Sequence, residues 1–394
     1  MLYYLIEYLG RLYDVPLLQV MQFIVVRATL AAFTALVIAL FLGKRIIRWL
    51  RKHQLGEQVR GDLIVDHAHK AGTPTMGGII ILLSILSGIL MWGDVRALYV
   101  WLIVLAVVGA GVIGLADDYI KTIKKNKKGL TPCVKLIGQA TLGILVGTAL
   151  FFHPQFADVR HLTYLPFTSE GLIDYGVLGT LSPVNLTWMV YIGVSVFIIT
   201  ALSNSVNITD GLDGLATGVT ALVSLGLVLL SYLAGSPALT NVLPVLYVPG
   251  AGELAVVAAT IAAACLGFLY HNRHPARVFM GDTGSLALGA AVGTIALMIR
   301  VELLLPILAL AFFVEACSVI LQVAYFKYSR WRRGTGQRLF PIAPIHHSFE
   351  KAGFEERRIA HVFWGVALLG LVITFSIIAY GSFESLTYAS LFNR

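Results

Sequence analysis

Residues 186–234 read LTWMVYIGVSVFIITAL, then SNSVNITDGLDG, then LATGVTALVSLGLVLLSYLA. The first and third segments are apolar and about as long as a helix that crosses a bilayer, which predicts two membrane-spanning helices. The segment between them, Ser203–Gly214, holds two Asp and two Asn residues but no Lys or Arg. Carboxylates this close to hydrocarbon are costly unless they bind a partner. An ordinary polar loop is the alternative, and the density of acceptors favours a binding site.

The same pattern of apolar runs continues along the whole chain. Of its 394 residues, 58% are hydrophobic and 13% are charged, and the mean hydropathy is +0.82. Soluble proteins carry about a quarter charged residues, so this composition predicts an all-α integral membrane protein. We expect residues 1–394 to form one polytopic domain without a cleavable signal peptide. The ten predicted spans are 18–43, 76–92, 98–116, 134–152, 186–202, 214–234, 253–270, 283–299, 303–326 and 360–380.

The basic residues predict the orientation of these spans. Of the 29 Lys and Arg residues, 23 fall in one set of alternate loops. Such loops are cytoplasmic in most membrane proteins, which with ten spans places both termini outside. The net charge of +8 is explained by this placement, so it does not indicate nucleic-acid binding. Pro306 predicts a bend near the start of the ninth span, and we expect Glu315 within it to make an interhelical hydrogen bond.

Polar clusters interrupt the apolar pattern on the predicted cytoplasmic side. We expect the helix bundle to bring five of these segments together in one cleft at the membrane surface. The residues concerned are Lys70, the pair Asp117 and Asp118, the triplet Asn207, Asp210 and Asp213, Asp282, and the pair His346 and His347.

The acidic residues allow two interpretations. Asp117 and Asp118 near Lys121 are either a solvated helix end with charge pairs or ligands of Mg²⁺, which typically takes one or two carboxylates plus substrate phosphates. Asp282 can cap the eighth span, and a helix N-terminus with flanking glycines also favours phosphate binding. These two roles of Asp282 are compatible. Lys135 supplies a positive charge for phosphate, although the topology alone explains most of the lysines.

Other chemistry is less well supported by the sequence. His346 and His347 are accompanied by neither an HExxH motif nor a nearby cysteine, which argues against zinc. The three cysteines are isolated and predict no disulfide framework. The chain also contains no GxxxxGK[ST] motif for ATP.

Five ordered motifs give the chain a family resemblance. They are HKAGTPTMGG at 69–78, GLADDY at 114–119, NITDGLDGL at 207–215, VFMGDTGSL at 278–286 and APIHH at 343–347. Together they resemble the polyprenyl-phosphate N-acetylhexosamine-1-phosphate transferases, and among these the bacterial phospho-N-acetylmuramoyl-pentapeptide transferases. The resemblance runs nearly end to end.

The resemblance implies a reaction in the bacterial inner membrane. UDP-N-acetylmuramoyl-pentapeptide and undecaprenyl phosphate would yield undecaprenyl-diphospho-N-acetylmuramoyl-pentapeptide (lipid I) and UMP, with Mg²⁺ as cofactor. This is the first membrane step of peptidoglycan synthesis. Members of the family are often homodimers, and no nucleic-acid partner is implied.

The resemblance also implies roles for individual residues. Asp282 would ligate Mg²⁺ beside the diphosphate, Asp117 and Asp118 would share the metal, and Asp117 would help to position the lipid phosphate. His346 and His347 match the first two residues of a family His-His-His run, whose third position is Ser348 here. Positions implied near the uridine are Lys70, Gly211, Leu212, Asp213 and Phe279, and positions implied near the sugar and phosphates are Lys135, Asn207, Asp210 and Asn272.

The sequence leaves two alternatives open. A sister transferase that uses a UDP-N-acetylhexosamine would share the Asp motifs and Mg²⁺, whereas the segment His69–Gly78 and the His346-His347 loop favour the muramoyl-pentapeptide enzyme. A cation-coupled transporter would place its carboxylates near mid-membrane in broken helices. Here nearly all of them are predicted at the cytoplasmic edge, which favours a transferase.

Overall fold

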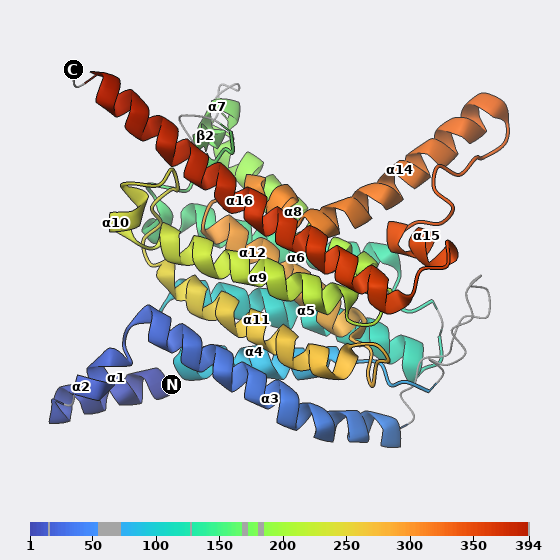
Figure 1. The fold of residues 1–394 in the computed structure, drawn as a ribbon, viewed down its shortest axis with the longest axis horizontal. Coiled ribbons are helices and arrows are strands. Elements are labelled where there is room, and N and C mark those ends of the chain that lie inside the picture. Colours follow the sequence, from blue (N-terminus) through green and yellow to red (C-terminus); the bar gives the residue numbers. More distant parts are fainter. Residues whose placement is uncertain (15, 54–71, 127, 168–171, 180–184, 393–394) are drawn as a thin grey trace.

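A computed structural model describes residues 1–14, 16–53, 72–126, 128–167, 172–179 and 185–392, of which residues 17, 178–179 and 382–392 are described by their backbone alone (Figure 1). The elements in chain order are α1 Leu2–Tyr13, α2 Pro16–Val20, α3 Ile24–Lys52, α4 Gly78–Trp92, α5 Leu98–Thr122, α6 Pro132–Phe152, η2 Pro154–Phe156, β1 Leu162–Tyr164, β2 Leu172–Asp174, α7 Tyr175–Gly179, α8 Thr187–Thr209, α9 Leu215–Ala234, α10 Pro237–Thr240, α11 Gly252–Asn272, α12 Gly281–Met298, η3 Glu302–Leu304, α13 Leu305–Leu308, α14 Leu310–Arg333, α15 Ile345–Lys351 and α16 Glu356–Phe392.

Each of the ten predicted spans overlaps a helix, and the chain is an all-α integral membrane protein. Within the described ranges, nine helices are long and apolar enough to cross a membrane. The tenth, α4, has 15 residues, in line with the short second span that the sequence predicts. The first and last spans are the least accurate predictions, because 18–43 was expected where α3 covers Ile24–Lys52, and 360–380 was expected where α16 covers Glu356–Phe392. The basic last turns of α3 continue the helix beyond the apolar run.

The long helices form an inner and an outer set (Figure 1). In the apolar 18-residue stretch of α12, 89% of the residues are buried, and most residues of the corresponding stretches of α9 and α11 are also buried. The corresponding share is 22% in α14, which lies on the outside with α3 and α16. α12 packs mainly against α5 and α8, and α11 packs mainly against α3 and α9. An inner helix between α5 and α8 is therefore the element that can bring their polar residues together.

The ninth predicted span is broken near Pro306. η3 and α13 precede a single non-helical residue, Ala309, and α14 then begins at Leu310. Pro306 lies in the first turn of α13, where its missing N–H needs no helical partner, so it suits the start of this short helix and does not by itself account for the break at Ala309. In Figure 1, α14 diverges from the bundle and leads to α15. This divergence places the residues after α14 beside the α8–α9 loop.

A small antiparallel hairpin was not predicted. β1 and β2 pair with Thr163 opposite Ile173, within the segment 153–185 that was expected outside the membrane. The backbone N–H of Tyr164 donates to the carbonyl of Arg300 at 2.8 Å, just beyond the end of α12. The side chain of Tyr175 donates to Glu302 at 3.0 Å. The hairpin is therefore attached to the end of α12 opposite Asp282.

Most of the predicted site residues lie at one end of the bundle. In Figure 1, the ends of α3 and α11 and the start of α16 lie toward the right, where α15 also lies. α1 and the last turns of α16 lie toward the left. The two chain ends thus lie on the opposite side from the start of α16.

Candidate active site

Three carboxylates from two helices meet where α5 and α12 cross. Asp117 and Asp118 lie in the last turns of α5, and Asp282 lies in the first turn of α12. One oxygen of each carboxylate lies within 4.8 Å of the others. The helices can approach this closely because position 114 of α5 is glycine, where a Cβ would overlap the carbonyl of Asp282.

Asp118 anchors the N-terminus of α12. Its Oδ1 accepts from the backbone N–H of Asp282 at 3.1 Å. Its Oδ2 accepts from the N–H and the hydroxyl of Thr283 at 2.9 and 2.6 Å. The sequence suggested that Asp282 caps this helix, and that prediction is wrong: the N-cap position is Met280, and Asp118 of α5 supplies the acceptors. The side chain of Asp282 consequently points elsewhere.

Two lysines face the other two carboxylates. Lys135 Nζ lies 2.5 Å from Asp282 Oδ2 and 2.8 Å from Asp117 Oδ2. Lys121 Nζ lies 2.5 Å from Asp117 Oδ2 and 3.5 Å from Asp282 Oδ2. Because Asp117 is 0% and Asp118 is 4% exposed, the interpretation of these residues as a solvated helix end is wrong. The cluster holds three acidic and two basic groups, an arrangement suited to a metal and phosphates together.

Asn207 extends this cluster from α8. Its amide donates to Asp282 Oδ1 at 3.0 Å and to the hydroxyl of Ser285 at 2.9 Å. Asn207 lies near the end of α8, and Ser285 lies in the second turn of α12. The polar stretch that interrupts the apolar pattern is therefore in direct contact with the carboxylate cluster.

The donor set of this cluster fits Mg²⁺. The ion prefers oxygen ligands, and three carboxylates lie within reach of one position. The backbone N–H of Leu130 donates to Asp117 Oδ1 at 2.6 Å, which leaves Oδ2 of that residue toward the lysines.

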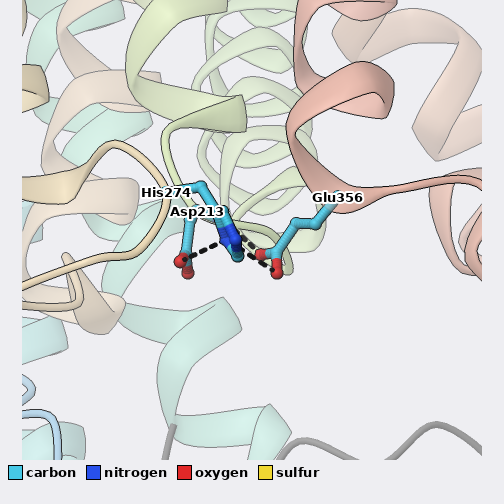
Figure 2. Close-up of side chains that lie close together, drawn as sticks. All are labelled: Asp213, His274 and Glu356. Carbon is cyan, nitrogen blue, oxygen red and sulfur yellow. Dashed lines mark hydrogen bonds and ion pairs between the residues drawn. The ribbon is translucent and has the colours of Figure 1, made fainter. Parts of the chain in front are cut away.

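A second polar cluster lies near the start of α16 (Figure 2). Asp213 belongs to the α8–α9 loop, His274 to the α11–α12 loop, and Glu356 begins α16. Nδ1 of His274 lies 3.2 Å from Asp213 Oδ2 and 3.5 Å from Glu356 Oε2. Asn272 stands beside this group, where its Oδ1 accepts from the N–H of Gly214 at 3.1 Å. The loop that includes Asp213 is thus held from several directions.

The two histidines occupy different environments. His346 is fully buried, and its Nδ1 lies 3.1 Å from Oε2 of the equally buried Glu315. A Cβ at position 211 would overlap its Nε2, so Gly211 permits the contact between the loops. His346 is therefore the interhelical neighbour of Glu315, but the pair has the distance of an ion pair without the geometry of the expected hydrogen bond. Nδ1 of His347 lies 3.0 Å from Oε2 of Glu350.

Ser348 is bonded to the backbone of the loop before α15. Its hydroxyl accepts from the backbone N–H of Ile342 at 3.1 Å and donates to the carbonyl of the same residue at 2.5 Å. A hydroxyl that bonds to backbone in this way stabilises a local turn. Ser348 thus serves the loop itself.

The remaining predicted site residues are placed as follows. Phe279 pairs through its backbone with Pro74 and Gly77, which joins the motif at 69–78 to the residues just before Asp282. Asp210 ends α8 and Leu212 is buried. Lys70 lies outside the described residues.

Sequence reasoning did not single out His274, Glu356 or Thr283 as site residues, and it treated Lys121 only as a charge-pair partner. The contact of Lys121 with Asp117 could have been predicted, because a residue four positions later lies on the same helix face. His274 lies in the α11–α12 loop and Glu356 begins α16, and their contact depends on how α11 and α16 pack. Periodicity carries no information about that contact.

Comparison with known proteins identifies the family of this chain. A model of the family described as "Glycosyl transferase family 4" matches residues 100–300. A phospho-N-acetylmuramoyl-pentapeptide-transferase signature matches residues 70–82. The chain is 55% identical over 376 residues to a phospho-N-acetylmuramoyl-pentapeptide-transferase of Salinibacter ruber, a match that covers 94% of this chain and 98% of the relative.

Two further relatives with the same name agree. The transferase of Chloroherpeton thalassium is 45% identical over 374 residues, covering 95% of this chain and 98% of the relative. That of Chlorobaculum parvum is 45% identical over 369 residues, covering 94% and 97%. With identity of this level over nearly full length, the chain belongs to the phospho-N-acetylmuramoyl-pentapeptide-transferase family.

Proposed function

We propose that this protein transfers phospho-N-acetylmuramoyl-pentapeptide from its UDP derivative to undecaprenyl phosphate, which yields lipid I and UMP. The proposal rests on one cluster of side chains, which consists of Asp117, Asp118, Asp282, Lys121 and Lys135. It is supported by the identity of 45–55% to phospho-N-acetylmuramoyl-pentapeptide-transferases. We further propose that the protein lies in the bacterial inner membrane with this cluster at its cytoplasmic side.

The bond changes are those of a phosphoryl transfer. An oxygen of the lipid phosphate attacks the phosphorus attached to the sugar, and the bond from that phosphorus to the bridging oxygen breaks. The electron pair of this bond leaves with UMP. We propose direct in-line attack, in which positioning and charge neutralisation supply most of the rate acceleration. A phospho-muramoyl enzyme trapped on an aspartate when the lipid is omitted would contradict this step.

The residues of the cluster divide these tasks. Lys121 and Lys135 would neutralise the negative charge of the donor and acceptor phosphates. Before substrate binds, the two lysines hold Asp117 and Asp282 close together. Asp118 fixes the start of α12, so that Asp282 keeps its place. Asp117, Asp118 and Asp282 would hold Mg²⁺, which supplies Lewis-acid stabilisation of the transferred phosphate.

Other residues are assigned to the donor. Lys70, Gly211, Leu212, Asp213 and Phe279 would contact uridine, whereas Asp210, Asn207, Asn272 and Lys135 would face the sugar and phosphates. His346 and His347 would flank this region, because His346 touches the loop at Gly211. We also propose that both termini lie outside the cytoplasm and that the protein is a homodimer.

The experiment that tests the proposed function compares donors. Purified protein in detergent is supplied with undecaprenyl phosphate and either UDP-N-acetylmuramoyl-pentapeptide or UDP-N-acetylglucosamine, and UMP and lipid product are measured. We expect turnover with the muramoyl-pentapeptide donor. Turnover with UDP-N-acetylglucosamine alone would assign the protein to a sister reaction, and no turnover with either donor would contradict the proposal.

A further inference from the structure

The second polar cluster connects three segments that are far apart in the sequence. Figure 2 shows Asp213, His274 and Glu356 pointing toward one another from the α8–α9 loop, the α11–α12 loop and the start of α16. The side chains of Asp213 and Glu356 are 3% and 8% exposed, whereas His274 is 34% exposed. Two buried carboxylates this close together are costly unless donors satisfy them. His274 lies where its Nδ1 can serve either one.

Backbone groups make this cluster a clamp on one loop. The N–H of Asp213 donates to Glu356 Oε1 at 2.6 Å. The N–H of Ala276 donates to Asp213 Oδ2 at 2.9 Å. Glu356 therefore holds the main chain of the α8–α9 loop, while the α11–α12 loop holds its side chain. Both backbone donors are bonded to carboxylate oxygens, and such bonds are stronger than those between neutral groups.

A second contact from α16 reinforces the clamp. Nε1 of Trp364 donates to the carbonyl of Gly214 at 3.2 Å, two turns after Glu356. The N–H of Gly214 is bonded to Asn272. Consecutive peptide groups of the loop are thus fixed by α11 and α16. A loop held at successive residues by rigid helices keeps its shape without a bound ligand, which lowers the entropy cost of binding.

This loop is the one that the proposed function assigns to uridine. We propose that His274 and Glu356 are positioning residues that hold the Gly211–Asp213 segment in the conformation that receives the uridine part of the donor. The inference rests on the proposed function and concerns two residues that sequence reasoning did not select. His274 and Glu356 act through Asp213 and its backbone, while the carboxylate cluster at Asp282 carries the transfer itself.

The variants Glu356→Gln and Glu356→Ala test the proposal. Glutamine can still accept from the N–H of Asp213 but places an amide donor or an uncharged oxygen toward His274, whereas alanine removes both contacts. We expect the KM for the UDP donor and the inhibition constant of UMP to rise together, by about 10-fold in Glu356→Ala and less in Glu356→Gln. The kcat at saturating donor and the KM for undecaprenyl phosphate should stay within about twofold of wild type.

The matched control is Glu355→Gln, an equal loss of charge at the exposed neighbouring residue, which should behave as wild type. A second pair of variants examines His274. Asparagine places an amide donor near the position of Nδ1, so His274→Asn should retain tighter UMP inhibition than His274→Ala. This conservative rescue would not follow if the cluster only filled space.

The outcomes separate this inference from the proposed function. If wild-type protein releases no UMP, the proposed function fails. If wild type is active and Glu356→Ala and His274→Ala keep wild-type values for the donor KM and for UMP inhibition, the positioning inference is wrong. A fall in thermal stability with both constants unchanged would also overturn it, since that result assigns the clamp to folding alone.

Discussion

The contacts of Asp118 predict that it stabilises the protein, in contrast to its neighbour Asp117. In Asp118→Asn, one carboxylate oxygen becomes an NH₂ group that faces donors of Asp282 or Thr283. The loss of one hydrogen bond to a charged acceptor costs about 1.5–3 kcal/mol, and the loss of negative charge at the N-terminus of α12 costs about 0.5–1 kcal/mol more. We therefore expect the variant to lose about 2–4 kcal/mol of stability.

The assay is the apparent Tm of detergent-solubilised protein, measured without substrates. For a chain of this length, such a loss corresponds to a decrease of about 2–5 °C. Asp117→Asn is the matched control, because the same change one residue away removes a charge that faces two lysines and two other carboxylates. Its Tm should change less, although both variants should lose activity. A wild-type Tm for Asp118→Asn, or an equal decrease for Asp117→Asn, would refute this assignment.

Three further perturbations have defined outcomes. Lys135→Met should lower kcat by about 10²–10³-fold because it removes the positive charge between Asp117 and Asp282. The matched control is Lys124→Met at an exposed lysine, which should keep the wild-type kcat. Equal activity of the two variants would contradict this prediction. Arg27→Met should destabilise the protein by about 3–5 kcal/mol, since it leaves Glu253 without its buried ion-pair partner. Arg11→Met breaks an exposed pair with Glu7 and should cost less than about 1 kcal/mol. Similar Tm values for the two variants would contradict this prediction. Removal of divalent ions with a chelator should abolish UMP release and added Mg²⁺ should restore it, so that full activity in the chelator would exclude a metal requirement.

The helical architecture could be predicted because it depends on hydrophobic length. A run such as 186–202 must form a helix in lipid, where every backbone group needs an internal partner. The short α4 also followed from local composition, and an irregularity near Pro306 was predicted from the proline, although the break itself lies three residues later at Ala309. The position where α3 ends did not follow, since basic residues continue the helix past the apolar run.

The candidate site was predictable in its residue types and only partly in its contacts. Asp117, Asp282 and Asn207 were selected from separate motifs, and the packing of α12 between α5 and α8 brings them together. Lys135, which lies outside these motifs, reaches them from α6. That Asp118 bonds to the start of α12 depends on the crossing at Gly114, which no sequence period encodes.

His274 and Glu356 show the same limit more clearly. The two residues are separated by two predicted spans, so only the tertiary arrangement shows that they share Asp213. Sequence motifs identify charged side chains that lie close to the membrane, where a charge costs free energy unless it has a partner. They do not identify the residues that hold such groups in place.

We propose that the carboxylate cluster around Asp282 transfers a sugar phosphate to a lipid phosphate. The most direct measurement is UMP release from UDP-N-acetylmuramoyl-pentapeptide by wild-type protein and by Asp282→Asn, with and without undecaprenyl phosphate and Mg²⁺. We predict release that requires the lipid, the metal and Asp282 together. Release by Asp282→Asn at the wild-type rate, or release that does not depend on the lipid, would contradict the account.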